Sequence, residues 1–318
     1  MIKNMTIKKM SIATILLFIC FLFVIFPSDD DSRVNIEESI EYSTNELTHE
    51  IYMIDKDNYV ARTNVILEEN DIEMKIRTLL EYLIIDGKKE SGVPNGFRSI
   101  IPSGTEINSI ELTEGLLKID FSKEILEIDQ SLENKMFESI IYTLTSIDEI
   151  KGIVIYVEGE LLTVLPKSNT NLPKVLDRSY GINKEYNITS TEDITKTTIY
   201  YISKTQEDYY YVPVTKIDNN NEDKVDIIID ELKSGPIYED NLMSFLNINT
   251  NLINYEIKDN TMYLKFDDNI LDNLENKTIL DEVVNTITYS VKDNYDVNDV
   301  IFQNFNDEII KSVSKTLE

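Results

Sequence analysis

The sequence has almost none of the residue types that build metal centres and covalent cross-links. Its 318 residues include one cysteine, Cys20, and one histidine, His49. A single cysteine excludes an intrachain disulfide and a thiolate metal site, and a single histidine excludes a site with several imidazole ligands. A serine–histidine–aspartate triad could draw only on His49, which we expect in the junction before the first strand. The folded part of the chain must therefore be held by its apolar cores.

Basic residues and glycine are also scarce. Lysine and arginine total 30 against 58 aspartate and glutamate residues, so the formal net charge is -28 at pH 7. Nucleic-acid binding needs clustered basic side chains that displace counterions, so no nucleic-acid partner is expected. The 9 glycines form no glycine-rich loop that could cradle a phosphate. Among so many carboxylates close pairs arise by chance, so no pair can be nominated as a catalytic acid and base. We therefore predict that the protein is not an enzyme, that it has no catalytic, cofactor-binding or metal-binding residues, and that it uses no cofactor.

The N-terminus carries the longest apolar run of the sequence, residues 10–26, between Lys9 and Pro27. Lysines precede the run and aspartates follow it, which predicts a cytoplasmic N-terminus and an outward remainder. We interpret residues 1–27 as a signal anchor or transmembrane segment and residues 28–48 as an acidic stalk. The predicted location is the cytoplasmic membrane, with a single span and the C-terminal domains outside the cytoplasm. A cleaved signal, or a lipoprotein acylated at Cys20, remains the alternative.

The rest of the chain repeats itself. Two strand-like segments open the copies, with residues 51–53 (IYM) aligned to residues 199–201 (IYY). The apolar stripe of a helix follows in both copies, and then a run that is apolar at every second position, residues 117–121 and 262–266. The stripe consists of Ile76, Leu79, Leu80 and Leu83 in the first copy and Val225, Ile228, Ile229 and Leu232 in the second. An order and spacing shared over this length predict a tandem repeat.

Each copy predicts the order strand, strand, helix, hairpin, helix, strand. The hairpins turn at residues 113–115 (TEG) and 258–260 (KDN), where glycine and asparagine readily take positive φ. The second helices are predicted around residues 132–144 and 280–291, and the last strands at residues 153–157 and 300–305. We assign the chain to the α+β class, as two tandem two-layer α/β sandwich domains, each with helices on one face of a small mixed sheet, behind the N-terminal transmembrane anchor. The predicted domains are residues 49–165 and 197–318, joined by a polar linker over residues 166–196.

Two local patterns invite a functional interpretation. Residues 218–223 (DNNNED) resemble the start of a calcium loop, but the turn glycine is missing and the twelfth position is Ile229, so we interpret the stretch as a loop that leads into a helix. Tyr209, Tyr210 and Tyr211 place aromatic rings on both faces of a strand, which suits either an edge that recruits another chain or an ordinary strand covered by its own domain. Pro213 would cap such an edge.

One stretch of the first copy resembles the core of the GerM domain family. It comprises residues 101–105 (IPSGT), the strand 107–112, Gly115 and residues 117–122 (LKIDFS), and residues 152–159 (GIVIYVEG) are similar to the last strand of that family. The second copy is degenerate: Asn247 and Asn249 replace the proline and glycine, Thr250 is kept, and residues 265–267 (KFD) replace the aspartate–apolar–serine run.

This resemblance implies a sporulation or germination protein of a spore-forming Gram-positive bacterium. It also implies a place outside the cytoplasmic membrane and a similarity of the tandem domains to the ring-building modules of secretion-type complexes. We therefore expect a non-enzymatic scaffold that associates with itself or with other envelope and sporulation proteins, and that reaches the membrane through its N-terminal helix. The alternatives are a module that binds a ligand or cell-wall fragment in a cleft between the repeats, and an extracytoplasmic hydrolase.

Overall fold

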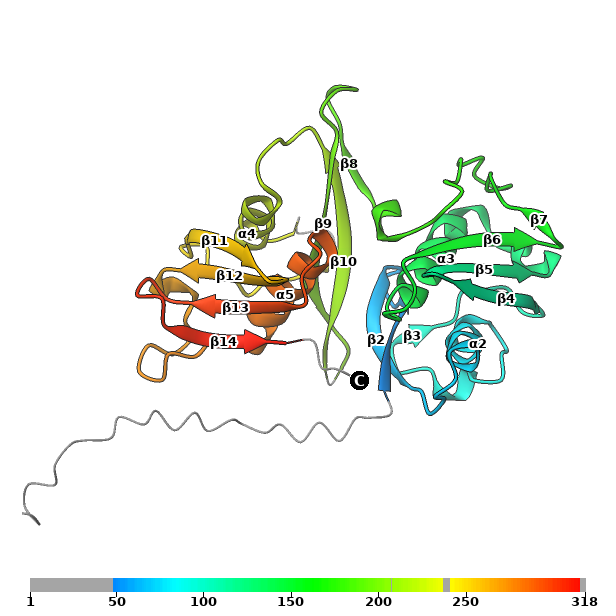
Figure 1. Cartoon of the computed structure of the whole chain (residues 1–318), viewed down its shortest axis with the longest axis horizontal. Helices are drawn as coiled ribbons and strands as arrows, with labels where there is room; N and C mark the ends of the chain where they lie inside the picture. The colour runs from blue at the N-terminus through cyan, green and yellow to red at the C-terminus, as the bar shows by residue number, and fades with distance from the viewer. Residues whose placement is uncertain (1–47, 207, 237–240, 315–318) are drawn as a thin grey trace, which may run out of the picture. The chain divides into compact units, whose positions relative to one another are not determined.

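The computed structural model describes residues 48–206, 208–236 and 241–314, which belong to one compact unit, Glu46–Glu318 (Figure 1). The predicted anchor, residues 1–27, and nearly all of the predicted stalk, residues 28–48, lie outside the described residues. Among the residues that are described, no helix is both long and apolar enough to cross a membrane.

The first repeat contains two helices and seven strands in the order that the sequence predicts, with two short strands added. Its elements are β1 (Thr48–Asp55), β2 (Val60–Ile66), α2 (Ile72–Leu83), β3 (Phe97–Arg98), β4 (Ile107–Thr113), β5 (Leu116–Phe121), α3 (Gln130–Leu144), β6 (Gly152–Val157) and β7 (Glu160–Leu161). Short 3-10 turns at Glu90–Gly92 and Lys123–Glu127 join them.

The second repeat follows the same plan. Its elements are β9 (Thr195–Lys204), β10 (Tyr209–Asp218), α4 (Lys224–Ser234), β11 (Leu252–Lys258), β12 (Thr261–Phe266), α5 (Asp281–Asn294), β13 (Asp299–Gln303) and β14 (Ile309–Val313), with a 3-10 turn at Asp268–Ile270. A 3-10 turn at Arg178–Tyr180 and the short strand β8 (Glu185–Asn187) lie between the repeats.

Local chemistry explains where several of these elements begin and turn. Asp71 and Asp223 stand at the N-caps of α2 and α4, and each carboxylate accepts a hydrogen bond from a backbone N–H of the first turn. The β4–β5 turn has positive φ at Glu114 and Gly115, and the β11–β12 turn has it at Asp259 and Asn260. Two consecutive residues in the left-handed region match the twist of a two-residue hairpin, so both predicted hairpins are confirmed.

The pairing of the strands differs from the prediction of one mixed sheet per domain. Each repeat contributes a four-stranded sheet, in the orders β4-β5-β6-β7 and β11-β12-β13-β14 (Figure 1). The opening hairpins of both repeats instead join one further sheet, in the order β3-β1-β2-β10-β8, with β9 paired to β10. The single-sheet expectation was wrong because periodicity identifies strands but not their neighbours, and here β2 and β10 of different repeats pair with each other.

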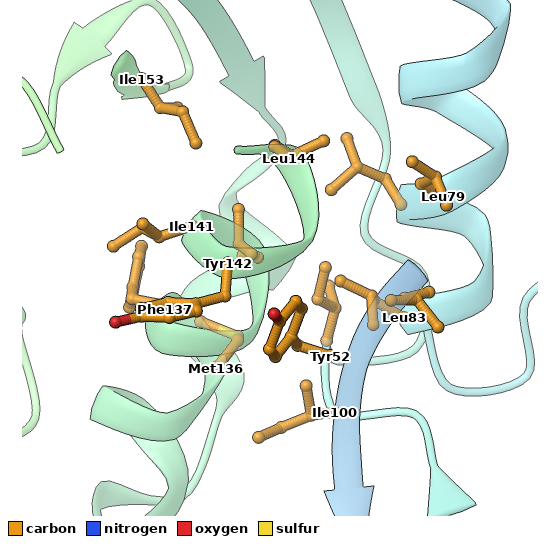
Figure 2. Packing of buried hydrophobic residues seen from close by; sticks show 14 of the residues in the cluster. Tyr52, Leu79, Leu83, Ile100, Met136, Phe137, Ile141, Tyr142, Leu144 and Ile153 are labelled. Atoms are coloured by element: carbon orange, nitrogen blue, oxygen red, sulfur yellow. The ribbon is translucent and has the colours of Figure 1, made fainter. Parts of the chain in front are cut away.

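Two apolar cores form, one for each repeat. In the first repeat, β1, α2 and α3 close around Tyr52, whose ring lies between side chains of both helices (Figure 2). The second core gathers the corresponding residues of β9, β10, α4, α5, β12 and β13, and it also takes Ala61 from β2 of the first repeat. All eight residues of the predicted first-helix stripes are buried, whereas Leu280 stands just before α5 and is exposed.

The predicted linker, residues 166–196, does join the repeats, but it is more than a connector. Leu172, Leu176 and Ile182 are buried in the first core, and Leu176 pairs with Ile153 beside β6. Farther along, β8 adds to β10 in parallel. The composition of residues 166–196 predicted a simple connector, because the few apolar residues that anchor this segment in the core are widely spaced. The linker is therefore part of the folded structure of both repeats.

Candidate functional site: the interface between the two repeats

The two repeats meet through equivalent strands. Strands β2 and β10 pair antiparallel at one position, where Arg62 lies opposite Tyr211. Tyr52 and Tyr200, which the repeat aligns with each other, place their hydroxyl oxygens 2.9 Å apart. When equivalent strands pair antiparallel and equivalent side chains meet, the contact has the form of a two-fold symmetric dimer interface. The chain thus carries a dimer-like interface within itself.

One linker side chain completes this seam. The Oδ1 atom of Asn183 accepts the N–H of Val60 at 3.0 Å, and its Nδ2 donates to the carbonyls of Val60 and Pro213 at 2.8 and 2.7 Å. Proline has no N–H to give a neighbouring strand, so a direct ladder cannot continue at Pro213. The carboxamide of Asn183 supplies the donor and acceptor instead, and the backbone N–H of Asn183 donates to Glu138 on α3 at 2.9 Å.

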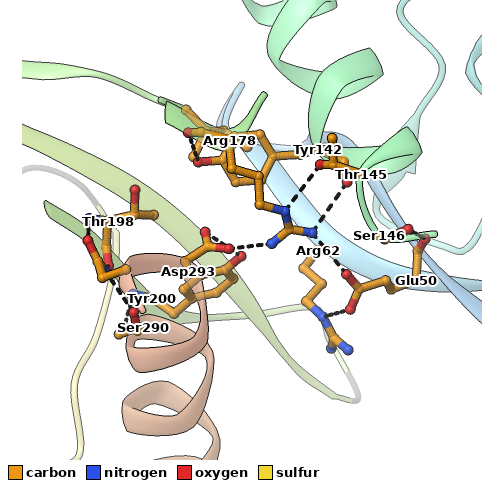
Figure 3. Close-up of polar contacts among 12 residues, drawn as sticks. Glu50, Arg62, Tyr142, Thr145, Ser146, Arg178, Thr198, Tyr200, Ser290 and Asp293 are labelled. Carbon is orange, nitrogen blue, oxygen red and sulfur yellow. Dashed lines mark hydrogen bonds and ion pairs between the residues drawn. The ribbon is translucent and has the colours of Figure 1, made fainter. Parts of the chain in front are cut away.

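A second linker residue, Arg178, lies at the centre of a polar network that includes both repeats (Figure 3). Its guanidinium donates to Asp293 on α5 and to Glu50 on β1, the latter at 3.3 Å. It donates further to Thr145 Oγ1 and to the carbonyl of Tyr142, at 3.2 and 3.5 Å. Because one planar group bonds to four partners from two repeats, it fixes their relative orientation as well as their contact.

The charges around Arg178 alternate in sign. Glu50 also accepts a bond from Arg62 Nε at 2.9 Å, and Asp293 accepts one from the Tyr200 hydroxyl at 3.1 Å. Burial alone would raise the pKa of the Glu50 carboxyl, but the nearby Arg62 and Arg178 outweigh it and hold that pKa at about 2. Burial raises the pKa of the Asp293 carboxyl, against the opposing effect of Arg178. Removing Arg178 would leave the buried Asp293 carboxylate without its counter-charge, whereas Glu50 would keep Arg62.

Helix side chains cover the outer edges of the two opening hairpins. On β1, the N–H of Tyr52 donates to Thr143 Oγ1 of α3 at 3.0 Å. On β9, the N–H of Tyr200 donates to Ser290 Oγ of α5 at 2.8 Å, and Asn294 bonds both the N–H and the carbonyl of Thr198. A strand edge whose backbone groups already have partners does not recruit a further strand. The same device in both repeats closes these edges to other chains.

The residues singled out in the sequence take structural positions. His49 lies inside β1 rather than before it, paired with Val65, and its Nε2 is 2.9 Å from Ser146 Oγ. β1 begins at Thr48, but its large apolar residues begin only at Ile51. The start of the strand was therefore predicted too late in the sequence. The stretch 218–223 leads into α4 as expected: Asp218 ends β10, the side chains of Asp218 and Asn220 accept N–H groups of the loop, and Asp223 caps the helix.

The tyrosine run belongs to a strand that is covered on both sides. Along its length β10 pairs with β9, and at Tyr211 it pairs with β2, so the edge that Pro213 was expected to cap is filled by the other repeat and by Asn183. Tyr210 is buried and donates to Asp55 at 2.9 Å. Tyr209 is half exposed and packs edge-on against Phe245. The recruiting edge is thus used within the chain, and the interpretation of an ordinary covered strand is the better one.

The interface roles of Arg178, Asn183 and Asp293 could not be predicted from the sequence. Arg178 and Asn183 lie in a segment whose composition is that of a loop, and Asp293 is one carboxylate among many. The tyrosines gave a usable signal, since Tyr52 and Tyr200 were already aligned by the repeat. In the described part of the chain, no group of three histidine, cysteine, aspartate or glutamate side chains is arranged to hold a metal ion. The groups gathered here bond to one another and orient the repeats.

Fold and interface together define a class, that of α+β proteins built from a tandem repeat. The family Germane, described as sporulation and spore germination, matches residues 50–163 and 198–308, and this chain belongs to that family. The spore germination protein GerM of Bacillus subtilis (strain 168) is 32% identical to it over 267 residues, which are 82% of this chain and 72% of that protein.

A solved structure agrees with this assignment. The tandem GerMN domains of the sporulation protein GerM from Bacillus subtilis match with a TM-score of 0.75 and 29% sequence identity, over 85% of this chain and 96% of that one. The resemblance drawn from the sequence is therefore confirmed. The match of the family to residues 198–308 includes the degenerate second copy.

Proposed function

We propose that this chain is a non-enzymatic assembly protein that acts in sporulation or spore germination, outside the cytoplasmic membrane and tethered to it by the apolar run of residues 10–26. The family and the matched relative support the process. The observation that carries the assembly role is the Arg178 network. Its charged groups are used to hold the repeats in one orientation, and a fixed orientation is what a protein needs to present two surfaces to partners at once.

The surfaces available for such partners follow from the strand pairing. Helix side chains cover the outer edges of the opening hairpins, so contacts would come from the two four-stranded sheets, β4-β5-β6-β7 and β11-β12-β13-β14. The two sheets are built alike, and the dimer-like seam sets them in a defined relation. Copies of the chain or other envelope proteins that bind both sheets would be held in register along the membrane.

The test compares a spore-forming strain that lacks this protein with strains that carry the intact chain or the Arg178→Ala variant. The intact chain should restore heat-resistant spores or their germination, and the variant should restore it poorly at equal protein level. In parallel, light scattering of residues 46–318 over a wide concentration range should show mass growth, or co-elution with an envelope protein from sporulating cells. The proposal would be refuted if residues 46–318 stay strictly monomeric and co-elute with no envelope protein, and if the strain that lacks the protein has no spore defect.

A hollow favours the second candidate, a module that binds a ligand or cell-wall fragment. It measures about 680 Å³ and is lined by Lys56 of the first repeat together with Ser203, Lys204, Met243 and Phe245 of the second. Ammonium groups and an aromatic ring suit an anionic or sugar-like ligand. Thermal stabilisation of residues 46–318 by soluble peptidoglycan fragments, lost in a Lys56→Ala/Lys204→Ala variant, would favour this function over assembly.

A further inference from the structure

In the first repeat an arginine of the first helix, α2, reaches the start of β4. Arg77 on α2 donates from Nη1 to the carbonyl of Ile107, the first residue of β4, at 3.3 Å. Its Nε and Nη2 atoms both donate to Glu73, one helical turn earlier, at 3.1 and 2.9 Å. The guanidinium therefore connects a strand carbonyl to a helix carboxylate and covers the beginning of that strand.

The second repeat has the opposite charge at this place. The stripe of α4 aligns with that of α2, which sets Asp226 at the position of Arg77 and Glu222 four residues before it, as Glu73 is before Arg77. Leu252 corresponds to Ile107, since each pairs with the last residue of the following strand and each is followed by a register shift. An ionised aspartate only accepts hydrogen bonds, so it cannot donate to a strand carbonyl as Arg77 does.

A hollow of about 350 Å³ lies where the arginine of the first repeat would be. Its lining includes Glu222, Asp226 and Asp230 from the α4 side and Asn251 and Leu252 at the start of β11. Lys233, paired with Asp230 at 3.4 Å, is the one basic residue of the lining. Desolvation raises the pKa of the Asp226 carboxyl, and repulsion from Asp223, Asp230 and Glu222 raises it further. A cation in the hollow would relieve that repulsion.

The strand beside this hollow is an open edge. β11 stands at the end of its sheet, and within the described part of the chain it pairs with β12 alone. Ile253 and Ile257 on this strand are 50% and 46% exposed. An end strand with exposed apolar side chains is a template to which an extended segment can add, with backbone bonds for affinity and side-chain contacts for specificity.

We propose that β11 is a docking edge for an extended segment of a partner protein, and that an arginine of this segment enters the hollow between α4 and Leu252. The guanidinium takes the place that Arg77 fills in the first repeat, bonding the Leu252 carbonyl and the carboxylates of Glu222 and Asp226. Arginine suits the site better than lysine because its planar fork donates in several directions at once. The site does not depend on the process in which the protein acts.

The test is a titration of residues 46–318 with an N-acetylated, C-amidated heptapeptide in which arginine alternates with valine. Binding is monitored by the amide NMR spectrum of the protein. Shifts should concentrate on β11 and α4. A peptide with citrulline in place of each arginine should bind at least about tenfold more weakly, because citrulline keeps N–H donors but loses the charge that strengthens the bonds to Glu222 and Asp226. Asp226→Arg supplies the first repeat's own residue and should abolish the arginine dependence. Glu275→Arg, an equal charge change at an exposed site outside the hollow, should leave the affinity within about twofold.

The amide spectrum of each variant shows whether it is folded, and Asp226→Asn, with no added bulk, gives a second test at the same position. Three results would overturn the proposal. They are equal affinity for the arginine and citrulline peptides, chemical-shift changes outside β11 and α4, and an equal loss of peptide affinity in Asp226→Arg and Glu275→Arg. So would shifts of the same residues by calcium chloride alone with displacement of the peptide, which would identify a cation site instead. A spore defect with no peptide binding would refute this site and leave the assembly role standing.

Discussion

The hydroxyl groups of Tyr52 and Tyr200 are 2.9 Å apart, although 148 residues separate the two tyrosines in the chain. They hold equivalent places in β1 and β9, and both rings are buried. Arg178 places its guanidinium over the Tyr52 ring, and Asp293 accepts from the Tyr200 hydroxyl. A contact between equivalent residues is what a symmetric dimer shows, so the tandem repeat behaves as a dimer whose two halves share one chain.

This contact predicts an energetic coupling between the repeats. Tyr52→Phe and Tyr200→Phe should each lower the free energy of unfolding by about 1 kcal/mol, and the double variant should lose less than the sum. Urea unfolding of residues 46–318 measures all three. Tyr263→Phe, on β12 and away from the seam, is the control and should change little. Strict additivity would mean that the two hydroxyls do not stabilise each other.

Removing Arg178 should be among the most damaging single changes outside the apolar cores. Arg178→Ala leaves Asp293 buried without its counter-charge, and we expect a loss of about 3 kcal/mol in the free energy of unfolding. Lys311→Ala, which breaks the exposed pair with Asp281, should cost no more than about 0.5 kcal/mol. Denaturant melts of both variants make the comparison. A similar small loss in both would show that the network does not hold the repeats together.

The side chain of Asn183 should protect the backbone amide of Val60, at the interface between the repeats, from hydrogen exchange. Asn183→Ala removes the acceptor for the Val60 N–H and the donor for the Pro213 carbonyl, and unpaired buried groups of this kind cost about 2 kcal/mol. Hydrogen exchange of the Val60 amide should become faster in the variant. Asn108→Ala, an exposed asparagine on β4, should leave that amide unchanged. Unchanged exchange at Val60 in Asn183→Ala would contradict the role assigned to this carboxamide.

Acid should weaken the interface through Glu50. Its pKa is about 2 in the folded chain against an ordinary 4.5, because Arg62 and Arg178 outweigh the effect of burial. A pKa that folding lowers contributes stability that is complete above the ordinary value and is lost as the pH falls toward the folded value. Glu50→Gln should therefore be less stable than the intact chain near neutral pH, by about 2 kcal/mol, with the difference shrinking between pH 4.5 and pH 2. A difference independent of pH would exclude ionisation of Glu50 as its cause.

Much of the fold could be predicted because the signals are local. The apolar stripe from Ile76 to Leu83 and its counterpart on α4 report a buried helix face directly, and glycine or asparagine after an acidic residue marks both hairpin turns. His49 was misplaced at a strand boundary, where local signals are weakest. The linker was misjudged because Arg178 and Asn183 are polar residues, and only their partners on distant elements show that they are built into the fold.

By itself the sequence determined the class of the chain, the repeat, the order of the helices and strands, and the resemblance to the family. Those properties depend on spacing along the chain, which periodicity reports. Only the tertiary structure decided that β2 pairs with β10, that Arg178 joins Asp293 to Glu50, and that Asp226 stands beside a hollow where the first repeat has Arg77. These relationships connect residues far apart in sequence, and a pairing across such distances is selected by burial and by charge in the folded state.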